Sequence, residues 1–284
     1  MELQAISALM QERYRIIMEK FSYEGKEEEA KERLRYLLSN QRISFSSLAP
    51  EPKDWNAWME ECIRNADWPG LCRVMNQRGK AGMMPSIYGG YHYEKNFHCM
   101  LECFACGNIL AMERILPPEL VRVKNFHSPF FPVAAHMLIG LWQRDKAVLE
   151  WAVPEAERFL EKKSSLLEKA MLSFLLDLES GDMDRGSEDL LAVCKSYPRD
   201  QRHVLGVRPF CTLAHGLYCL AQILLPEDVF GNLNMPKYKN FISEFARWRR
   251  EHSDPDLSLW FRYPEDMAMI NGIYEAPPAR LVLW

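Results

Sequence analysis

The feature that most constrains this chain is the helical spacing of its apolar residues. In the segment "SSLLEKAMLSFLLDLES" they recur at steps of one, three and four positions. The members of this stripe are Leu166, Leu167, Ala170, Met171, Phe174, Leu175 and Leu178. Such spacing makes one wide apolar face on an α-helix. Convincing strand patterns are absent, because β-branched residues are sparse and no hairpin with an Asn-Gly or Asp-Gly turn is recognisable.

Start and stop signals flank this stripe and the segment that follows it. Ser165 and Glu168 form a capping box at its start. Gly181 supplies the stop, since glycine readily adopts the left-handed conformation that ends a helix. The next helix is predicted over about 187–196, with Ser187 as its N-cap.

The same reasoning predicts helices along most of the chain. They are expected near 2–22, 26–40, 54–65, 67–77, 94–115, 130–143, 145–162, 210–225, 236–252 and 264–273. Pro154 should kink or split the helix in which it lies, because proline has no backbone N–H to donate.

Short connections between these helices indicate how they pack. Neighbouring helices joined by a few residues form antiparallel hairpins. The sequence therefore predicts an all-α fold, in which antiparallel helix pairs stack into a bundle or a short solenoid-like array of the TPR or HEAT kind. The chain, 1–284, is expected to form a single helical domain. It can be subdivided into N-terminal helices over 1–78 and a helix-pair array over 94–284, joined by a loop over 79–93.

Charge and composition argue against several classes of function. The 284 residues carry a net charge of −4 and the pI is near 6.0, so binding to nucleic acid is not expected. The N-terminus lacks the pattern of a signal peptide, and no apolar run approaches the roughly 18 residues that span a bilayer. We therefore expect no membrane association and a cytoplasmic location, with the eight cysteines as reduced thiols.

Cysteine and histidine gather on one face of each of two predicted helices. These faces carry Cys99, Cys103 and Cys106, and Cys211, His215 and Cys219. Two such helices facing each other could coordinate a metal ion. The C-x-x-C spacing within the first face could serve redox chemistry, but the βαβ context of that motif is missing. The simplest interpretation is that cysteine serves here as a small residue of the hydrophobic core. We therefore predict no bound metal and no cofactor.

The 79–93 loop, "GKAGMMPSIYGGYHY", lacks helical periodicity and is rich in methionine and tyrosine. Loops of this length are uncommon inside compact domains and are often functional, and both residue types are enriched in interface cores. The alternative is a loop that folds back and caps the core. We predict a partner-binding surface formed by this loop with the help of two exposed acids. Its residues are Met83, Met84, Tyr88, Tyr91, Tyr93, Asp182 and Asp184.

No recognisable catalytic motif accompanies these features. The segment "GDMDRGSED" fails as a calcium loop, because Gly186 is one position early and Val193 stands where the bidentate glutamate belongs. We interpret it as a solvated turn. Walker loops, dinucleotide fingerprints, nucleophile elbows and H-E-x-x-H are missing. A lone histidine on an apolar helix, such as His136, is typical of a hydrogen-bonded core residue. The sequence thus predicts a protein that is not an enzyme.

The segments "RPFCTLAHGLYCLAQILLPEDVFGNLNMPKYKNFISEFARW" and "RYPEDMAMINGIYEAPP" resemble the C-terminal half of large all-helical immunity proteins. These are cytosolic antitoxins of bacterial polymorphic toxin, contact-dependent and type VI secretion systems. The middle segment, from "VAAHMLIGLWQRDKAVLEW" to "LLDLESGD", is similar to their helix pairs. The resemblance covers about 95–275 and contains no invariant motif, so it transfers no site residues.

This resemblance implies a stoichiometric inhibitor that binds a cognate toxin and neutralises it in bacterial competition. The implied partner is a secreted toxin or effector protein. A helical-repeat scaffold or adaptor is the alternative, with a peptide or a component of a secretion system as its partner. Both functions use the same fold and differ in what is bound.

Overall fold

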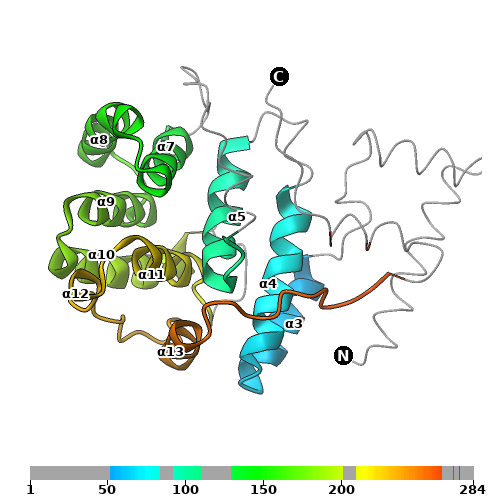
Figure 1. Cartoon of the computed structure of the whole chain (residues 1–284). Helices are drawn as coiled ribbons and strands as arrows, with labels where there is room; N and C mark the ends of the chain where they lie inside the picture. The colour runs from blue at the N-terminus through cyan, green and yellow to red at the C-terminus, as the bar shows by residue number, and fades with distance from the viewer. Residues whose placement is uncertain are drawn as a thin grey trace, which may run out of the picture.

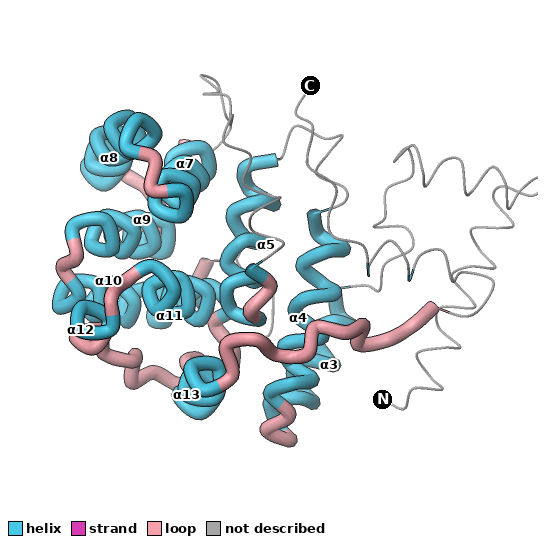
Figure 2. Tube along the Cα trace, viewed as in Figure 1, coloured by secondary structure: helices cyan, strands magenta, loops and turns pink. Residues whose placement is uncertain are grey.

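The computed structural model describes most of the chain, and every regular element in the described part is helical (Figures 1 and 2). The described residues are 52–83, 92–109, 129–200, 209–263, 271 and 275. The predicted all-α fold is confirmed over these residues. Of the expected helices, those at 2–22 and 26–40, and all but one residue of 264–273, lie outside the described residues.

The described residues form ten α-helices and a 3₁₀ turn. Their bounds are α3 Pro52–Arg64, α4 Trp68–Met83, α5 His92–Cys106, α7 Phe130–Gln143, α8 Lys146–Glu161, α9 Leu166–Ser180, α10 Met183–Ser196, η3 Tyr197–Arg199, α11 Thr212–Leu224, α12 Glu227–Phe230 and α13 Ser243–Glu251.

Consecutive helices from α7 onward pair and stack in layers. Only Arg144 and Asp145 separate α7 from α8, and only Gly181 and Asp182 separate α9 from α10. Connections this short make each pair an antiparallel hairpin. Figure 1 shows α7 and α8 at one end of the stack, α9 next, and α10 to α12 beyond it, with α3 to α5 standing upright beside the stack. The structure therefore contains the predicted helix pairs.

The boundaries of α9 follow from the residues that flank it. Ser165 Oγ accepts hydrogen bonds from the backbone N–H of Leu167 and Glu168, and the Glu168 carboxylate accepts from Ser165 N. The predicted capping box is thus confirmed. At the other end Gly181 has a φ of 78°, and Asp182 N donates to Asp177 O at 3.0 Å. This left-handed turn satisfies the last carbonyls of the helix.

One prediction for the neighbouring helices is wrong, and one of the two outcomes predicted for Pro154, a split helix, is absent. The helix expected from Ser187 begins at Met183, because Asp182 is its N-cap and accepts from Arg185 N at 3.3 Å. The predicted solvated turn is therefore only two residues long. In addition, α8 contains Pro154 without being split. Proline is tolerated because its side of α8 is exposed, so water can reach the carbonyl that loses its donor.

The core is centred on α5 and α11, which pack closely. A Cβ atom on Gly216 would lie 2.2 Å from the carbonyl oxygen of Leu101, so the two backbones approach as only glycine allows.

The helix predicted over 94–115 ends at Cys106. Gly107 has a φ of 85°, and Asn108 N donates to Cys103 O at 2.9 Å, which completes a left-handed helix end.

A buried arginine anchors that end of α5. Arg249 of α13 is 5% exposed, and its Nε donates to Ala105 O at 3.1 Å. A Cβ atom on Gly107 would lie 2.4 Å from the guanidinium. The cation thus lies at the negative end of the α5 dipole, where it is favourable.

The first half of the helix predicted over 236–252 is not helical, because Asn240 O accepts instead from Cys211 N at 2.8 Å.

An extended strap, residues 255–263, crosses from α13 to α4 and α3 (Figure 2). Its alternate residues Leu259, Phe261 and Tyr263 are buried in a cluster with Trp55 and Trp58 of α3. Alternate burial is the pattern of an extended chain with one face on a core.

Side-chain amides replace a partner strand for the strap. Gln77 Nε2 donates to Phe261 O at 3.1 Å, and Phe261 N donates to Gln77 Oε1 at 3.2 Å. Asn76 Nδ2 donates to Leu257 O at 2.9 Å, and Asn271 makes the same two-way contact with the backbone of Tyr263. The strap backbone is thereby hydrogen-bonded although it lies in no sheet.

Candidate functional site

The two predicted cysteine and histidine faces lie in the core, on helices that pack against each other. Their members Cys99, Cys103, Cys106, Cys211, His215 and Cys219 are all buried. The prediction that cysteine serves here as a core residue is confirmed by this burial. Cys211 differs slightly from expectation, because it is the N-cap residue of α11 and does not lie within the helix.

The buried thiols are poorly suited to chemistry. Burial raises the pKa of Cys106 to about 12 and of Cys219 to about 11, and raises the pKa of Cys103 well above its usual range. These sulfurs are protonated at neutral pH, whereas nucleophiles and metal ligands need the thiolate. No group of three or more histidine, cysteine, aspartate or glutamate residues in the described ranges could hold a metal ion.

His215 is enclosed by aromatic rings. Its ring stacks between Phe210 and Phe241, with centroid distances of 4.4 and 4.2 Å. The Nε2 atom accepts from Ile242 N at 3.1 Å, and burial lowers the pKa of this imidazole to about 3. His215 is therefore neutral and links α11 to the start of α13. His136 is likewise buried, with Nδ1 2.6 Å from Pro132 O, in agreement with the predicted core role.

The loop predicted over 79–93 is shorter than expected. Residues 79–83 continue α4, and residues 92 and 93 belong to α5. Helix α4 extends because its end packs on α5, where Arg78 Nε donates to Glu102 Oε1 at 2.6 Å. Met83 is thus the last residue of α4. Tyr93 is in the first turn of α5, and Met84, Tyr88 and Tyr91 lie outside the described residues.

The predicted acids lie at the turn between α9 and α10, and both Asp182 and Asp184 are exposed. They belong to an acidic hairpin end, residues 177–189, with six carboxylates and one guanidinium. The carboxylates are Asp177, Glu179, Asp182, Asp184, Glu188 and Asp189, and the cation is Arg185. The structure thus places two of the seven predicted contact residues on one strongly negative surface.

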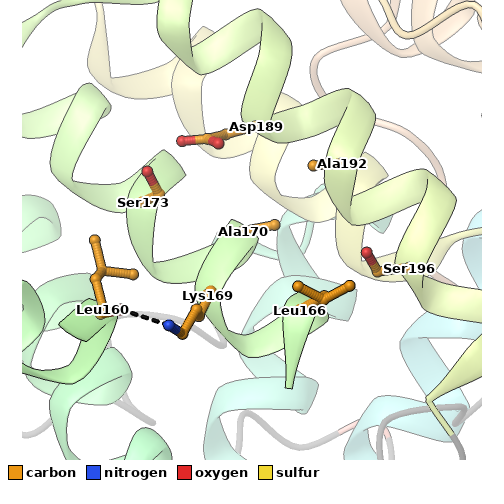
Figure 3. Close-up of a pocket in the computed structure, with 8 residues that line it drawn as sticks. All are labelled: Leu160, Leu166, Lys169, Ala170, Ser173, Asp189, Ala192 and Ser196. Carbon is orange, nitrogen blue, oxygen red and sulfur yellow. Dashed lines mark hydrogen bonds between the residues drawn. The ribbon is translucent and has the colours of Figure 1, made fainter. Parts of the chain in front are cut away.

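A shallow groove of about 310 Å³ begins beside this acidic end and runs between α9 and α10, bordered by α8 (Figure 3). It is lined by Leu160, Leu166, Lys169, Ala170, Ser173, Asp189, Ala192 and Ser196. Lys169 Nζ is turned to the end of α8 and donates to Leu160 O at 2.5 Å. The groove is therefore apolar toward the start of α9 and acidic toward Asp189.

Leu166 borders the apolar end of the groove and is 73% exposed. Among the described residues it is the most exposed large apolar side chain. The sequence pattern placed it in the buried stripe of α9, and this prediction is wrong. Leu166 is the first residue of the helix and borders the groove, which leaves its side chain open to solvent. A single exposed leucine is common on protein surfaces, so Leu166 matters here only together with the groove and the acidic end beside it.

Two carboxylates meet below the acidic end of the groove. Asp177 of α9 is 3% exposed, its Oδ1 lies 3.8 Å from Arg185 Nε, and its Oδ2 has no hydrogen-bond donor. The pKa of Asp177 is raised to about 7, mainly by burial and in addition by hydrogen bonding with Asp189 and by the negative charge of Asp189. Arg185 lowers this pKa and Asp182 raises it. Asp177 therefore takes up a proton at a much higher pH than an ordinary aspartate does.

The groove escaped the sequence analysis because it is formed by two helices together. One signal was present in the sequence of α9. Leu166, Ala170, Ser173 and Asp177 follow each other at steps of four, three and four, which places them on one face. This face changes from apolar to acidic along the helix, unlike the uniformly apolar stripe beside it.

Comparison of the chain with models of protein families, with curated proteins and with solved structures gives no match. None of the described helices is long and apolar enough to cross a membrane. The acidic hairpin and its groove are thus the best-supported candidate site on physical grounds.

Proposed function

We propose that this protein is a cytoplasmic immunity protein, which neutralises a secreted bacterial toxin by forming a stoichiometric complex with it. The observation that best supports the proposal is the α9–α10 surface, where an apolar groove with an exposed leucine adjoins an end with six carboxylates and one guanidinium. An apolar contact beside a field of one sign is suited to a protein partner of opposite charge.

The buried cysteine and histidine side chains of the core are consistent with this proposal. Cys106 and Cys219 have raised pKa values and His215 is neutral, so these buried groups offer neither an activated nucleophile nor an accessible base. The groove lies at the lower end of the roughly 300–1,000 Å³ range of small-molecule sites. It fits a side chain of a partner better than an extended cofactor.

Co-expression with the product of the gene immediately upstream tests the proposal. If that product alone stops growth, this protein should restore growth and elute with it as a stable complex from a sizing column. A harmless neighbour, or rescue without a complex, would contradict neutralisation by binding.

A helical scaffold or adaptor is the second candidate, and the layered helix pairs from α7 to α12 favour it (Figure 1). Stacked pairs of this kind present continuous surfaces for peptides. The same co-expression separates the two functions. An adaptor would bind its partner but would not restore growth that a toxin has stopped.

A further inference from the structure

The α9–α10 groove offers two chemically different regions within reach of a single long side chain. Ala170 and Ala192 line its middle, Leu166 lines its apolar end, and Asp189 and Ser173 line its acidic end (Figure 3). Leu166 and Ser173 are seven residues apart on one helix, a rise of roughly 10 Å. Lysine and arginine have the matching build, with an apolar stem and a cationic head.

The acidic end of the groove carries a charge that is not fully compensated. Asp177 has a buried oxygen with no donor, and Arg185 approaches the other oxygen only to 3.8 Å. Lys169 also lines the groove but donates to the carbonyl of Leu160 at the end of α8. A further cation at Asp189 would therefore meet one carboxylate that lines the groove, with the buried Asp177 and one guanidinium of the protein behind it.

We propose that this groove binds a lysine or arginine side chain of the partner protein, with its stem on Ala170 and Ala192 and its cation on Asp189. The inference rests on the proposed function only in taking the ligand to be a protein.

Binding of this kind releases a proton. The pKa of Asp177 is about 7, so this group is partly protonated near neutral pH, and an incoming cation at Asp189 favours its charged form. The other charged groups that act on Asp177 are Arg185, which lowers its pKa, and Asp182, which raises it. Affinity for a cationic guest should therefore rise as the pH rises through 7.

Butylguanidinium tests the site on the intact protein, with neutral butylurea as its isosteric control. Amide NMR titrations at pH 8 should show butylguanidinium shifting the signals of Ser173, Asp189 and Ala192, and binding should be weaker at pH 5.5. Asp189→Asn should weaken binding about tenfold or more at pH 8, because a charge-assisted contact is lost.

Glu188→Gln is the matched control variant. Glu188 is the exposed neighbour of Asp189 on α10 and does not line the groove, so its loss removes the same charge without removing the contact. Three results would each overturn the proposal. They are equal weakening of butylguanidinium binding by both variants, NMR shifts with butylurea as large as those with butylguanidinium, and an affinity that does not change with pH.

The outcome is separable from that of the proposed function. If co-expression yields a tight complex whose affinity is unchanged by Asp189→Asn, the immunity function stands and this site is wrong. If butylguanidinium binds as described and the upstream product is harmless, the site stands and the immunity function does not.

Discussion

Gly216 is the residue at which the core tolerates the least change. A Cβ atom there would lie 2.2 Å from the carbonyl oxygen of Leu101, which is backbone and cannot rotate away. We expect Gly216→Ala to lower the free energy of unfolding by about 1–3 kcal/mol, although alanine is the better helix former. Urea denaturation monitored by circular dichroism measures the change.

Gly186 provides the matched control for that prediction. A Cβ atom on Gly186 would meet Met183 and Phe174 at 3.5 and 3.6 Å, which is ordinary contact. Gly186→Ala should therefore raise the free energy of unfolding by about 0.5–1 kcal/mol through helix propensity. Similar losses for both variants would show that close helix approach is not what Gly216 provides.

Asp177 makes stability depend on pH in a direction unusual for an aspartate. Its pKa is raised from 3.8 to about 7 in the folded protein, so the folded state binds more protons than the unfolded state between these values. Stability contributed by this group is therefore lost as the pH rises from about 4 to 7. Asp177→Asn cannot ionise and should raise the melting temperature at pH 8 by roughly 2–4 °C, with less effect at pH 5.

Thermal unfolding of both proteins between pH 5 and pH 8 checks this expectation. Glu179→Gln is the control, because Glu179 is exposed on the same helix and should leave the pH dependence of the wild type unchanged. A wild-type melting temperature that is flat across this window would contradict the assigned role of Asp177.

At the scale of elements, the strap is held by contacts that a single substitution can remove. Gln77 is fully buried and makes both of its hydrogen bonds to the backbone of Phe261. Gln77→Ala leaves a buried N–H and a buried carbonyl without partners, at a cost of about 1–3 kcal/mol each. Hydrogen exchange over residues 255–263 should become faster, whereas Gln222→Ala, on α11, should leave it unchanged.

Helix interiors were predictable from the sequence and helix ends less so. The interior follows from local periodicity, and α7 has the predicted bounds of 130–143. The ends depend on distant partners. Helix α5 stops where Arg249 occupies the space beside Gly107, and residues 236–242 are drawn into contact with α11 through Asn240. No local pattern carries these contacts, which join residues far apart in the chain.

The same distinction applies to the candidate site. Asp182 and Asp184 were predicted because charge in a turn is visible in the sequence. Asp189 and Leu166 were not, because a groove exists only when α9 and α10 are placed side by side. The effect of Asp189 on the pKa of Asp177 likewise needs two helices.

For the whole molecule, the distribution of charge matters more than its sum. The net charge is only −4, yet residues 177–189 combine six carboxylates with one guanidinium. A local field of this kind accelerates the encounter with a basic partner and acts most strongly at low salt. Under the proposed function, this end of the α9–α10 hairpin should steer the partner toward the groove.

Charge reversal at the hairpin end tests this steering. The double variant Asp182→Lys with Asp184→Lys should slow association about tenfold at low salt, with little change in the dissociation rate, since both residues are exposed. Glu150→Lys with Glu157→Lys makes the same change in net charge on the exposed face of α8. Stopped-flow binding to the partner found by co-expression compares the two. Equal slowing would mean that only net charge attracts the partner, whereas slowing confined to the hairpin variant locates the encounter at the groove.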